Sequence, residues 1–493
     1  MDAKPAPPTD MDEVERIDVS AVNKSGERTL YAPRERIHPK RAEGRFRHIK
    51  WAVMAATLSV YYFTPWIRWD RGPTAPDQAV LIDFPARRFY FFFIEIWPQE
   101  VYYLTGLLIL AAMGLFLITS LAGRVWCGYT CPQTVWTDLF LVVERFVEGD
   151  RNARLRLDRT PWNSAKIGKK LVKHIIWILI AIATGGAWVF YFADAPILAG
   201  QLARFEAPVT AYGFVGLFAA TTYLLGAIAR EQVCIYMCPW PRIQGAMLDE
   251  ESLVVTYHAD RGDPRGSHKQ GEGWEDRGHC VDCNQCVAVC PTGIDIRDGQ
   301  QLECITCALC IDACNGIMEK VGLPAGLISY DTHANMERRT KGEKPRLRLL
   351  RPRVLLYASV MMIVGLIMLF TLIGRSDLDM NVLRDRNPVF VQLADGGVRN
   401  AFTVKVLNKR HQTRRLDLLV SGLFGARLRV IGQVDESQQL TVPPDQLRSF
   451  RVLVSVPPGT LTANSQPLTF SVADTEGGTT ATYEAVFRGP AIK

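Results

Sequence analysis

HCVDCNQCVAVCPTG, residues 279–293, places four cysteines at the spacing C-x2-C-x2-C-x3-C, with a proline directly after the last of them. The run ECITCALCIDACNG, residues 303–316, repeats this spacing further along the chain. Three cysteines at such close spacing wrap one iron–sulfur cube, and the fourth reaches the other cube of a two-cluster ferredoxin. The doubled motif therefore predicts two [4Fe–4S] clusters in a ferredoxin-like α+β module, residues 250–335, which relays electrons one at a time.

The eight cysteines divide between the two predicted clusters by this rule. Asn315 stands where the first run has its proline, which weakens the turn expected there without removing a ligand. Zinc knuckles are the alternative, but they usually pair C-x2-C units across a longer gap. The predicted ligand sets are Cys280, Cys283, Cys286 and Cys314 for one cluster, and Cys304, Cys307, Cys310 and Cys290 for the other.

Much of the remaining chain is apolar in long stretches. Five stretches without Asp, Glu, Lys or Arg approach the ~20 residues that a helix needs to cross a bilayer. We therefore predict a five-helix transmembrane bundle rather than the buried helices of a large soluble core. A shorter run, residues 87–98, is expected to lie in the membrane interface or to re-enter. The five stretches are 51–67, 101–123, 174–193, 207–229 and 354–374.

The basic residues predict the orientation of these crossings. The segments 1–50, 124–173 and 338–353 hold 11, 10 and 8 Lys and Arg, whereas the two intervening loops hold 4 and 1. Positive charge stays inside, so these three segments are expected to be cytoplasmic in a multi-pass protein of a bacterial inner membrane. An odd number of crossings then leaves the C-terminal region in the periplasm. The net charge of +7 reflects this membrane bias and does not call for a nucleic-acid partner.

Cysteine usage agrees with that topology. All 12 cysteines lie between residues 127 and 314, on the predicted cytoplasmic side. In a reducing compartment, clustered cysteines are more often metal ligands or redox groups than structural disulfides.

Four of the cysteines form two C-x3-C-P motifs, GRVWCGYTCPQTVW (123–136) and EQVCIYMCPWPRI (231–243). Each motif directly follows a predicted crossing. Cysteines four apart share one face of a helix, and the proline is expected to end or kink that turn. The two pairs are predicted to meet at the membrane surface, as one four-thiolate site or as two redox dithiols; soft thiolates favour Cu(I), zinc or iron–sulfur. These cysteines are Cys127, Cys131, Cys234 and Cys238.

The other segments complete the predicted domain order. Residues 376–493 alternate apolar and polar positions between turn residues, which indicates about seven strands of an all-β, immunoglobulin-like sandwich. The chain shows no nucleotide-binding glycine motif, so its electron donor must be a separate reductase, a soluble donor or a quinol. The full order is a mostly disordered cytoplasmic arm without a cleavable signal peptide (1–46), a membrane domain with four helices and both C-x3-C-P motifs (47–249), the ferredoxin-like module (250–335), a basic linker with the fifth helix (336–375), and the periplasmic sandwich (376–493).

Taken together, these motifs resemble a known family. YAPRERIHPKRAEGRFR (31–47), VWCGYTCPQTVWTDLF (125–140), CIYMCPWPRIQGAM (234–247), the doubled ferredoxin motif and the β-rich tail are similar to the cytochrome c oxidase accessory family CcoG, also called FixG or RdxA. The resemblance covers essentially the whole chain. The membrane part is more distantly similar to the NapH and NosR electron-transfer proteins.

The resemblance implies a role in assembling cbb3-type cytochrome oxidase by reducing Cu(II) to Cu(I). Copper would then be a substrate, and the four C-x3-C-P cysteines would be the catalytic or copper-handling thiols. The implied partners are the membrane, oxidase subunits or copper-delivery proteins, and an electron donor of unknown identity. Two alternatives remain open: a non-catalytic factor for oxidase assembly or copper handover, and a quinol-linked electron conduit of the NapH type.

Overall fold

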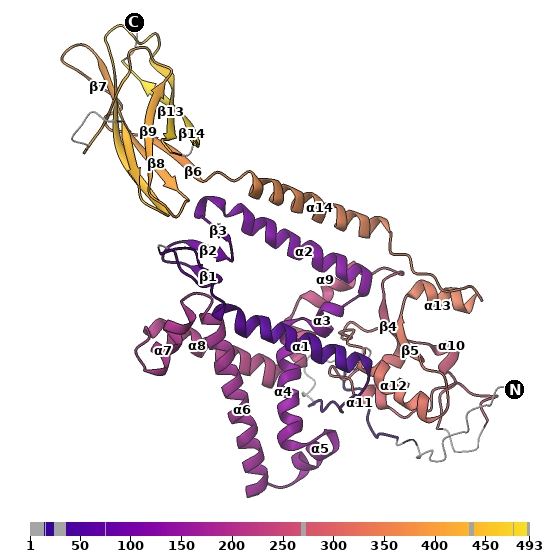
Figure 1. Cartoon of the computed structure of the whole chain (residues 1–493). Coiled ribbons are helices and arrows are strands. Elements are labelled where there is room, and N and C mark those ends of the chain that lie inside the picture. Colours follow the sequence, from indigo (N-terminus) through magenta and orange to yellow (C-terminus); the bar gives the residue numbers. More distant parts are fainter. Residues whose placement is uncertain are drawn as a thin grey trace, which may run out of the picture. The chain divides into compact units, whose positions relative to one another are not determined.

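The computed structural model describes residues 14, 16–23, 36–73, 75–267, 273–432, 438–476 and 478–490. The chain forms two compact units (Figure 1). The first contains Met1–Ile67 and Gln78–Met368, and the second contains Arg68–Asp77 and Leu369–Lys493. All 12 cysteines therefore belong to the first unit.

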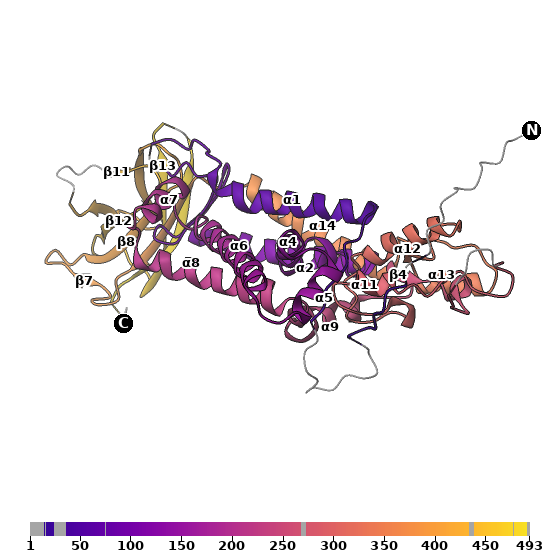
Figure 2. The ribbon, with the colours of Figure 1, turned by 90° about the horizontal axis from the view of Figure 1, so that it is seen from below.

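Long apolar helices are the main feature of the membrane part. Among the described residues, four helical segments are long and apolar enough to cross a membrane. A helix meets the demand of lipid because its backbone hydrogen bonds are internal. In Figure 2, α6 and α8 run side by side. The four segments are Pro98–Ala122, which includes η2 (Pro98–Glu100) and α2 (Tyr102–Ala122); α6 (Ser164–Val189); Val209–Ala229, made of α8 (Val209–Thr222) and the π-helix η3 (Tyr223–Ala229); and α14 (Pro352–Ile373).

The first predicted crossing, residues 51–67, falls mainly within α1 (Arg45–Phe63) and ends in the short η1 (Thr64–Trp66). α1 begins earlier than predicted because its basic first turns are held inside the protein. Arg47 donates to Asp138 at 2.9 Å, and Lys50 is only 3% exposed. With these charges α1 is not one of the four apolar segments, so the count of five crossings and their orientation stay predictions.

Residues 80–96 form a small antiparallel sheet, and the interfacial or re-entrant position of residues 87–98 stays a prediction. The strands are connected by turns in which Arg87 and Phe92 take left-handed φ angles of 56° and 51°. Tyr90 and Trp97 are buried. Length alone excluded a crossing for this stretch, but its alternation of side chains indicates strands. The sheet order is β1 (Val80–Asp83), β2 (Arg88–Phe91) and β3 (Ile94–Ile96).

The predicted ferredoxin-like module has the expected α+β character. Its two strands, β4 and β5, pair antiparallel in the register Val254↔Asp331 and Tyr257↔Ile328, which brings the two ends of the module together. Each cysteine run leads into a helix. The elements are β4 (Val254–Tyr257), α10 (Ala259–Gly262), α11 (Gln285–Ala288), η5 (Ile296–Asp298), α12 (Leu309–Lys320), β5 (Ile328–Asp331) and α13 (His333–Thr340).

The described part of the N-terminal arm, residues 14, 16–23 and 36–46, packs on this module. The rest of the arm, for which disorder was predicted, lies outside the described residues. Ile17 donates its backbone N–H to the carbonyl of Cys283 at 3.0 Å, and Lys40 donates to Ala288 at 2.8 Å. Ile17 and Ile37 are buried. Burial of these two apolar side chains stabilises the ordered form of a largely polar segment. This stabilisation offsets conformational entropy that is lost when the segment is ordered.

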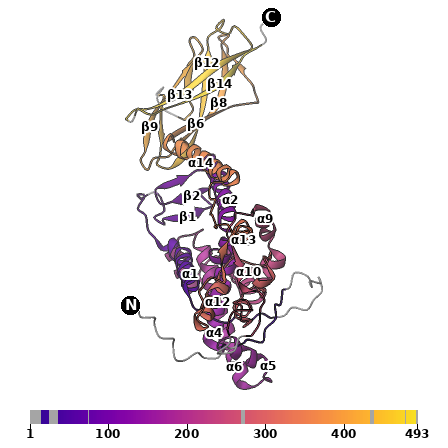
Figure 3. The same ribbon diagram turned by 90° about the vertical axis from the view of Figure 1, so that its right-hand side faces the viewer.

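The second unit is an immunoglobulin-like sandwich of two sheets (Figure 3). The five-stranded sheet has the order β10-β12-β8-β6, with β7 also pairing β8, and the four-stranded sheet has the order β11-β9-β13-β14. Phe402 and Phe470 meet across the core with ring centroids 5.0 Å apart. The strands are β6 (Leu378–Arg384), β7 (Val391–Gln392), β8 (Val398–Asn408), β9 (Arg414–Ser421), β10 (Arg427–Val430), β11 (Gln439–Val442), β12 (Gln446–Val456), β13 (Ser465–Asp474) and β14 (Thr480–Arg488).

Candidate functional site

The eight cysteines of the doubled motif gather around two small neighbouring cavities. One is lined by the first predicted ligand set, and the other by the second set together with Cys286. The grouping is the one expected from the spacing, with the last cysteine of each run crossing to the other group. The groups are Cys280, Cys283, Cys286 and Cys314, and Cys290, Cys304, Cys307 and Cys310.

The backbone around both cavities has the same unusual shape. Two and four residues after the first cysteine of each run, non-glycine residues adopt left-handed φ angles between 50° and 60°: Asp282 and Asn284 in one loop, Thr306 and Ala308 in the other. Backbone N–H groups in such turns form a concave anion-binding surface of the type found at iron–sulfur sites. Four thiols and this backbone suit an anionic iron–sulfur cluster in each cavity.

Buried polar contacts hold both loops in this shape. Arg297 donates to Asp282 at 2.7 Å and to the side chain of Asn284 at 2.8 Å. Tyr330 donates its hydroxyl to the carbonyl of Thr306 at 2.7 Å. The first loop is therefore fixed at both of its left-handed residues and the second loop at one, in each case by hydrogen bonds from outside the loop.

In both C-x3-C-P motifs the first cysteine lies in a short helical segment and the second does not, which differs in part from the expected helical turn. Cys127 lies in α3 (Val125–Tyr129) and Cys234 lies in the π-helix η4 (Val233–Met237). The second cysteine of each motif is extended, with φ and ψ of −57° and 128° at Cys131 and of −81° and 122° at Cys238. A residue before proline avoids the helical region, and proline favours the start of a helix. In each motif the helical turn ends before the proline, as predicted, and the proline also opens the next helix. These next helices are α4 (Pro132–Glu148) and α9 (Trp240–Met247), the latter with Pro239 as its N-cap.

All four C-x3-C-P cysteines line one cavity of about 240 Å³, with Trp126 and Trp240 also in its wall. Burial raises the pKa of the Cys127 thiol. Burial, followed by the neighbouring thiols of Cys131 and Cys127, raises the pKa of Cys234 to about 12. Burial therefore favours the protonated form of these two thiols.

Met237, in the second motif, is 62% exposed. It is not among the residues that line the cavity, although Val233, Cys234 and Cys238 of the same motif are.

The four-cysteine cavity lies directly beside one of the cluster loops. Tyr129 donates its hydroxyl to the carbonyl of Cys307 at 3.2 Å, and Arg124 donates to the carbonyl of Cys304 at 3.1 Å. A Cβ atom added to Gly128 would lie 2.7 Å from the carbonyl oxygen of Ile305. The first C-x3-C-P motif and the loop 304–310 therefore touch through their backbones.

Residues that sequence reasoning missed complete this contact. Cys127 Sγ lies 3.1 Å from Oε1 of Gln244, and Arg124 donates Nε to the same oxygen at 3.2 Å. Gln244 is completely buried. The glycine inside C-G-Y-T-C was the available signal of a close approach, but nothing in the sequence tells which backbone approaches it.

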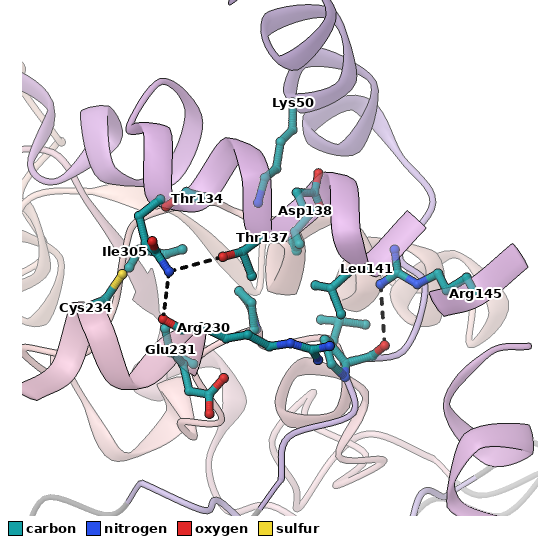
Figure 4. Close-up of a pocket in the computed structure, with 16 residues that line it drawn as sticks. Lys50, Thr134, Thr137, Asp138, Leu141, Arg145, Arg230, Glu231, Cys234 and Ile305 are labelled. Atoms are coloured by element: carbon teal, nitrogen blue, oxygen red, sulfur yellow. Dashed lines mark hydrogen bonds between the residues drawn. The ribbon is translucent and has the colours of Figure 1, made fainter. Parts of the chain in front are cut away.

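A second, smaller cavity of about 40 Å³ lies on the other side of Cys234 (Figure 4). Lys50 extends from α1 into it and faces Thr137 and Asp138 of α4. Lys50 makes no hydrogen bond or ion pair within 4.0 Å in the part of the chain that the structure describes, although it is buried. A positive charge therefore lies close to the loop of Cys307. Burial raises the pKa of the Cys307 thiol, and the charge of Lys50 opposes this rise in part.

Next to this cavity, Glu144 collects three buried cations. Its carboxylate accepts from Arg230 at 2.5 Å and from Arg154 at 2.8 Å, and Lys173 lies 3.6 Å away. Burial works against ionisation of this carboxyl, but Arg230, with Arg154 and Lys173, outweighs it and lowers the pKa of Glu144 to about 2. Since Arg230 lies between the two π-helical segments η3 and η4, this network fixes the start of the second C-x3-C-P motif.

Comparisons with known proteins agree with these features. Residues 229–333 match a family model described as a 4Fe-4S dicluster domain, and residues 104–147 match a 4Fe-4S binding domain. Residues 368–490 match the immunoglobulin-like fold at the C-terminus of FixG. The chain therefore has iron–sulfur binding domains, apolar membrane helices and a C-terminal β-sandwich.

Two relatives match nearly the whole chain, and a third matches part of it. The nitrogen fixation protein FixG of Rhizobium meliloti is 53% identical, and the match covers 97% of both chains. Protein RdxB of Cereibacter sphaeroides is 50% identical over 94% of this chain and 98% of that protein. The ferredoxin-type protein NapH of Haemophilus influenzae is 27% identical over 42% of this chain and 65% of that protein. The resemblance inferred from the motifs is confirmed: the chain belongs to the FixG/RdxA family.

Proposed function

We propose that this membrane iron–sulfur protein reduces Cu(II) to Cu(I) at the four-cysteine cavity, for assembly of a cbb3-type cytochrome oxidase. The observation that carries the proposal is the backbone contact between this cavity and the loop of Cys304–Cys310. Four soft sulfur donors favour the cuprous state over the cupric one. A site that stabilises the product beside a one-electron carrier has what this reaction needs.

The ligand assignment is part of the proposal. The two cysteine groups around the small cavities hold two [4Fe–4S] clusters, which supply one-electron reduction and oxidation. The four C-x3-C-P thiols bind copper as substrate and lose protons as they bind it. Tyr129 and Arg124 keep the cavity against the loop of Cys304–Cys310, so that the electron has a short path to the bound Cu(II). One electron converts one Cu(II) to Cu(I).

The proposed topology follows the distribution of basic residues. We propose that α1 crosses the bacterial inner membrane together with the four apolar segments, which leaves all cysteines in the cytoplasm and the β-sandwich in the periplasm. The sandwich is the surface we propose for oxidase subunits or copper-delivery proteins. Alkaline phosphatase fused after residue 493 is expected to be active, and the same fusion after residue 335 inactive. The opposite pattern would exclude this arrangement.

Anaerobic Cu(II) reduction tests the chemistry. Detergent-purified protein is reduced with dithionite, freed of excess reductant and mixed with Cu(II), while Cu(I) is followed with a chromogenic chelator and the clusters by their visible absorbance. We expect Cu(I) to appear as the clusters are reoxidised. A Cys234→Ala/Cys238→Ala variant should keep its iron content but lose the rapid phase, whereas Met237→Leu, an exposed change in the same motif, should behave as the parent protein.

The two alternative functions, a copper-handover factor and a quinol-linked electron conduit, predict different results. If the clusters stay reduced in the presence of Cu(II), copper is not the acceptor. Tight copper binding by the four thiols without cluster oxidation would instead favour a handover factor.

A further inference from the structure

A separate cavity of about 410 Å³ lies on the other flank of the same cluster loop. Cys304 and Thr306 are part of its wall, together with Arg124. The cavity lies within the volume range of small-molecule binding sites. The proposed copper chemistry makes no use of it, although a molecule bound there would lie directly against a cluster ligand.

The cavity lies where two candidate membrane spans end. Arg351, just before α14, pairs with Asp249 of the cavity wall and donates to the carbonyl of Ser120 in α2 at 2.8 Å. The backbone of Leu253 donates to the carbonyl of Leu121 at 3.1 Å. A molecule dissolved in the membrane would therefore reach this cavity without crossing the protein.

The lining indicates an uncharged aromatic or similarly apolar ligand with polar groups at its ends. Leu248, Val254, Val255 and Leu302 supply apolar surface. Two carboxylates, Asp249 and Glu250, also line the cavity and oppose a phosphate-bearing ligand such as a nucleotide or flavin cofactor.

The single guanidinium in the wall is already engaged. Arg124 directs Nε to Gln244 and Nη1 to the carbonyl oxygens of Leu302 and Cys304. It is therefore committed to holding the cluster loop rather than to binding an anion.

We propose that this cavity binds a lipid-soluble hydroquinone, which is the electron donor of the protein. The inference rests on the iron–sulfur redox function proposed above. Oxidation of a hydroquinone to the quinone releases two electrons and two protons. Two [4Fe–4S] clusters held by the eight cysteines would accept one electron each, and the carboxylate of Glu250 and the imidazole of His333, both in the cavity wall, take the protons.

This assignment also explains why two one-electron carriers are useful beside a one-electron substrate. A hydroquinone delivers its electrons as a pair, whereas each Cu(II) accepts one. Cys280, Cys283, Cys286 and Cys314 would hold the cluster that lies farther from the four-cysteine cavity, and that cluster would supply a place for the second electron until the next Cu(II) binds.

The test uses the full-length protein with oxidised clusters and duroquinol as the probe, under anaerobic conditions and without copper. We expect duroquinol to bleach the visible absorbance of the clusters. Gly245→Val places a larger side chain in the cavity wall, where an added Cβ lies 3.1 Å from the end of Leu302, and should raise the KM for duroquinol. A Glu250→Gln/His333→Gln variant should slow cluster reduction at saturating duroquinol by about 10-fold or more.

Two controls separate this inference from the proposed function and from misfolding. Dithionite should reduce the clusters of every variant fully, and dithionite-reduced variants should reduce Cu(II) at the parental rate. Glu337→Gln, an exposed carboxylate change on the nearby α13, should leave the duroquinol reaction unchanged.

The inference is overturned if duroquinol neither reduces the clusters of the parent protein nor binds to it in equilibrium titrations with the corresponding quinone. It is equally overturned if duroquinol reduces all variants alike. Failure of Cu(II) reduction alone would count against the proposed function and leave the donor site standing.

Discussion

Replacing Gly128 with alanine tests the contact on which the proposed electron path depends. The new Cβ would lie 2.7 Å from the carbonyl oxygen of Ile305, and 3.0 and 3.1 Å from the Cα and N atoms of Cys307. Ordinary contact begins at 3.4 Å, so the two backbones must separate by the difference, about 0.7 Å. Every atom met is backbone, and no flexible side chain can move aside.

The expected cost follows from overpacking. Such insertions cost about 1–3 kcal/mol, and the higher helix propensity of alanine returns up to about 1 kcal/mol. We therefore expect the unfolding free energy to fall by roughly 1–2 kcal/mol and the rapid phase of Cu(II) reduction to slow, because the four-cysteine cavity moves away from the cluster loop.

The assay compares Gly128→Ala with Gly168→Ala. Gly168 lies in α6 and has nothing within 4 Å of its added Cβ, so the same chemical change should be harmless there. Thermal unfolding, iron content and the stopped-flow Cu(II) reduction rate are measured for both. Equal stability and equal rates in the two variants would refute the close packing of the motif on the loop.

Three further predictions concern the buried charges. Lys50→Met removes a buried cation beside the loop of Cys307 and should lower the reduction potential of one cluster by on the order of 50–100 mV. An EPR-monitored redox titration measures this shift, with the exposed Lys341→Met as control. Unchanged potentials would contradict the prediction. Glu144→Gln leaves three buried cations with less compensation and should cost about 3 kcal/mol in thermal or denaturant unfolding, whereas the exposed Glu43→Gln should be neutral. Since the pKa of Glu144 is lowered to about 2, its stabilisation is present above about pH 4.5 and is lost as the pH falls toward 2; circular dichroism across this window should show a smaller loss in Glu144→Gln.

The parts of the site that the sequence predicts are those encoded by short spacing. Three cysteines at x2 spacing must lie on one tight loop, so the sorting of eight cysteines into two groups follows from local geometry. The meeting of Cys127 and Cys234 is a less direct inference, because it relies on two separate helices ending at the same level. The structure brings both pairs around one cavity, as expected.

The parts that escaped prediction depend on contacts far apart in the sequence. The charged start of α1 resembles a polar flank, and only the distant carboxylates of Asp138 and Asp312 make it a buried helical start. Nothing in the sequence around Gln244 indicates that its side-chain oxygen contacts Cys127. The extended backbone of Cys131 and Cys238 escaped prediction for a different reason: the restriction on the residue before proline was available in the sequence but was given less weight than helical spacing.

The N-terminal arm has a consequence for how this protein can be divided. Ile17 and Lys40 bind the backbone of the cysteine-rich region more than 200 residues later in the chain, at Cys283 and Ala288. A recombinant fragment of residues 250–335 would therefore lack the N-terminal residues that pack on it, although its cysteine pattern resembles that of an independent ferredoxin domain. Its clusters would be more open to solvent and oxygen than those of the intact chain, so potentials or lifetimes measured on the excised fragment would not be those of the protein.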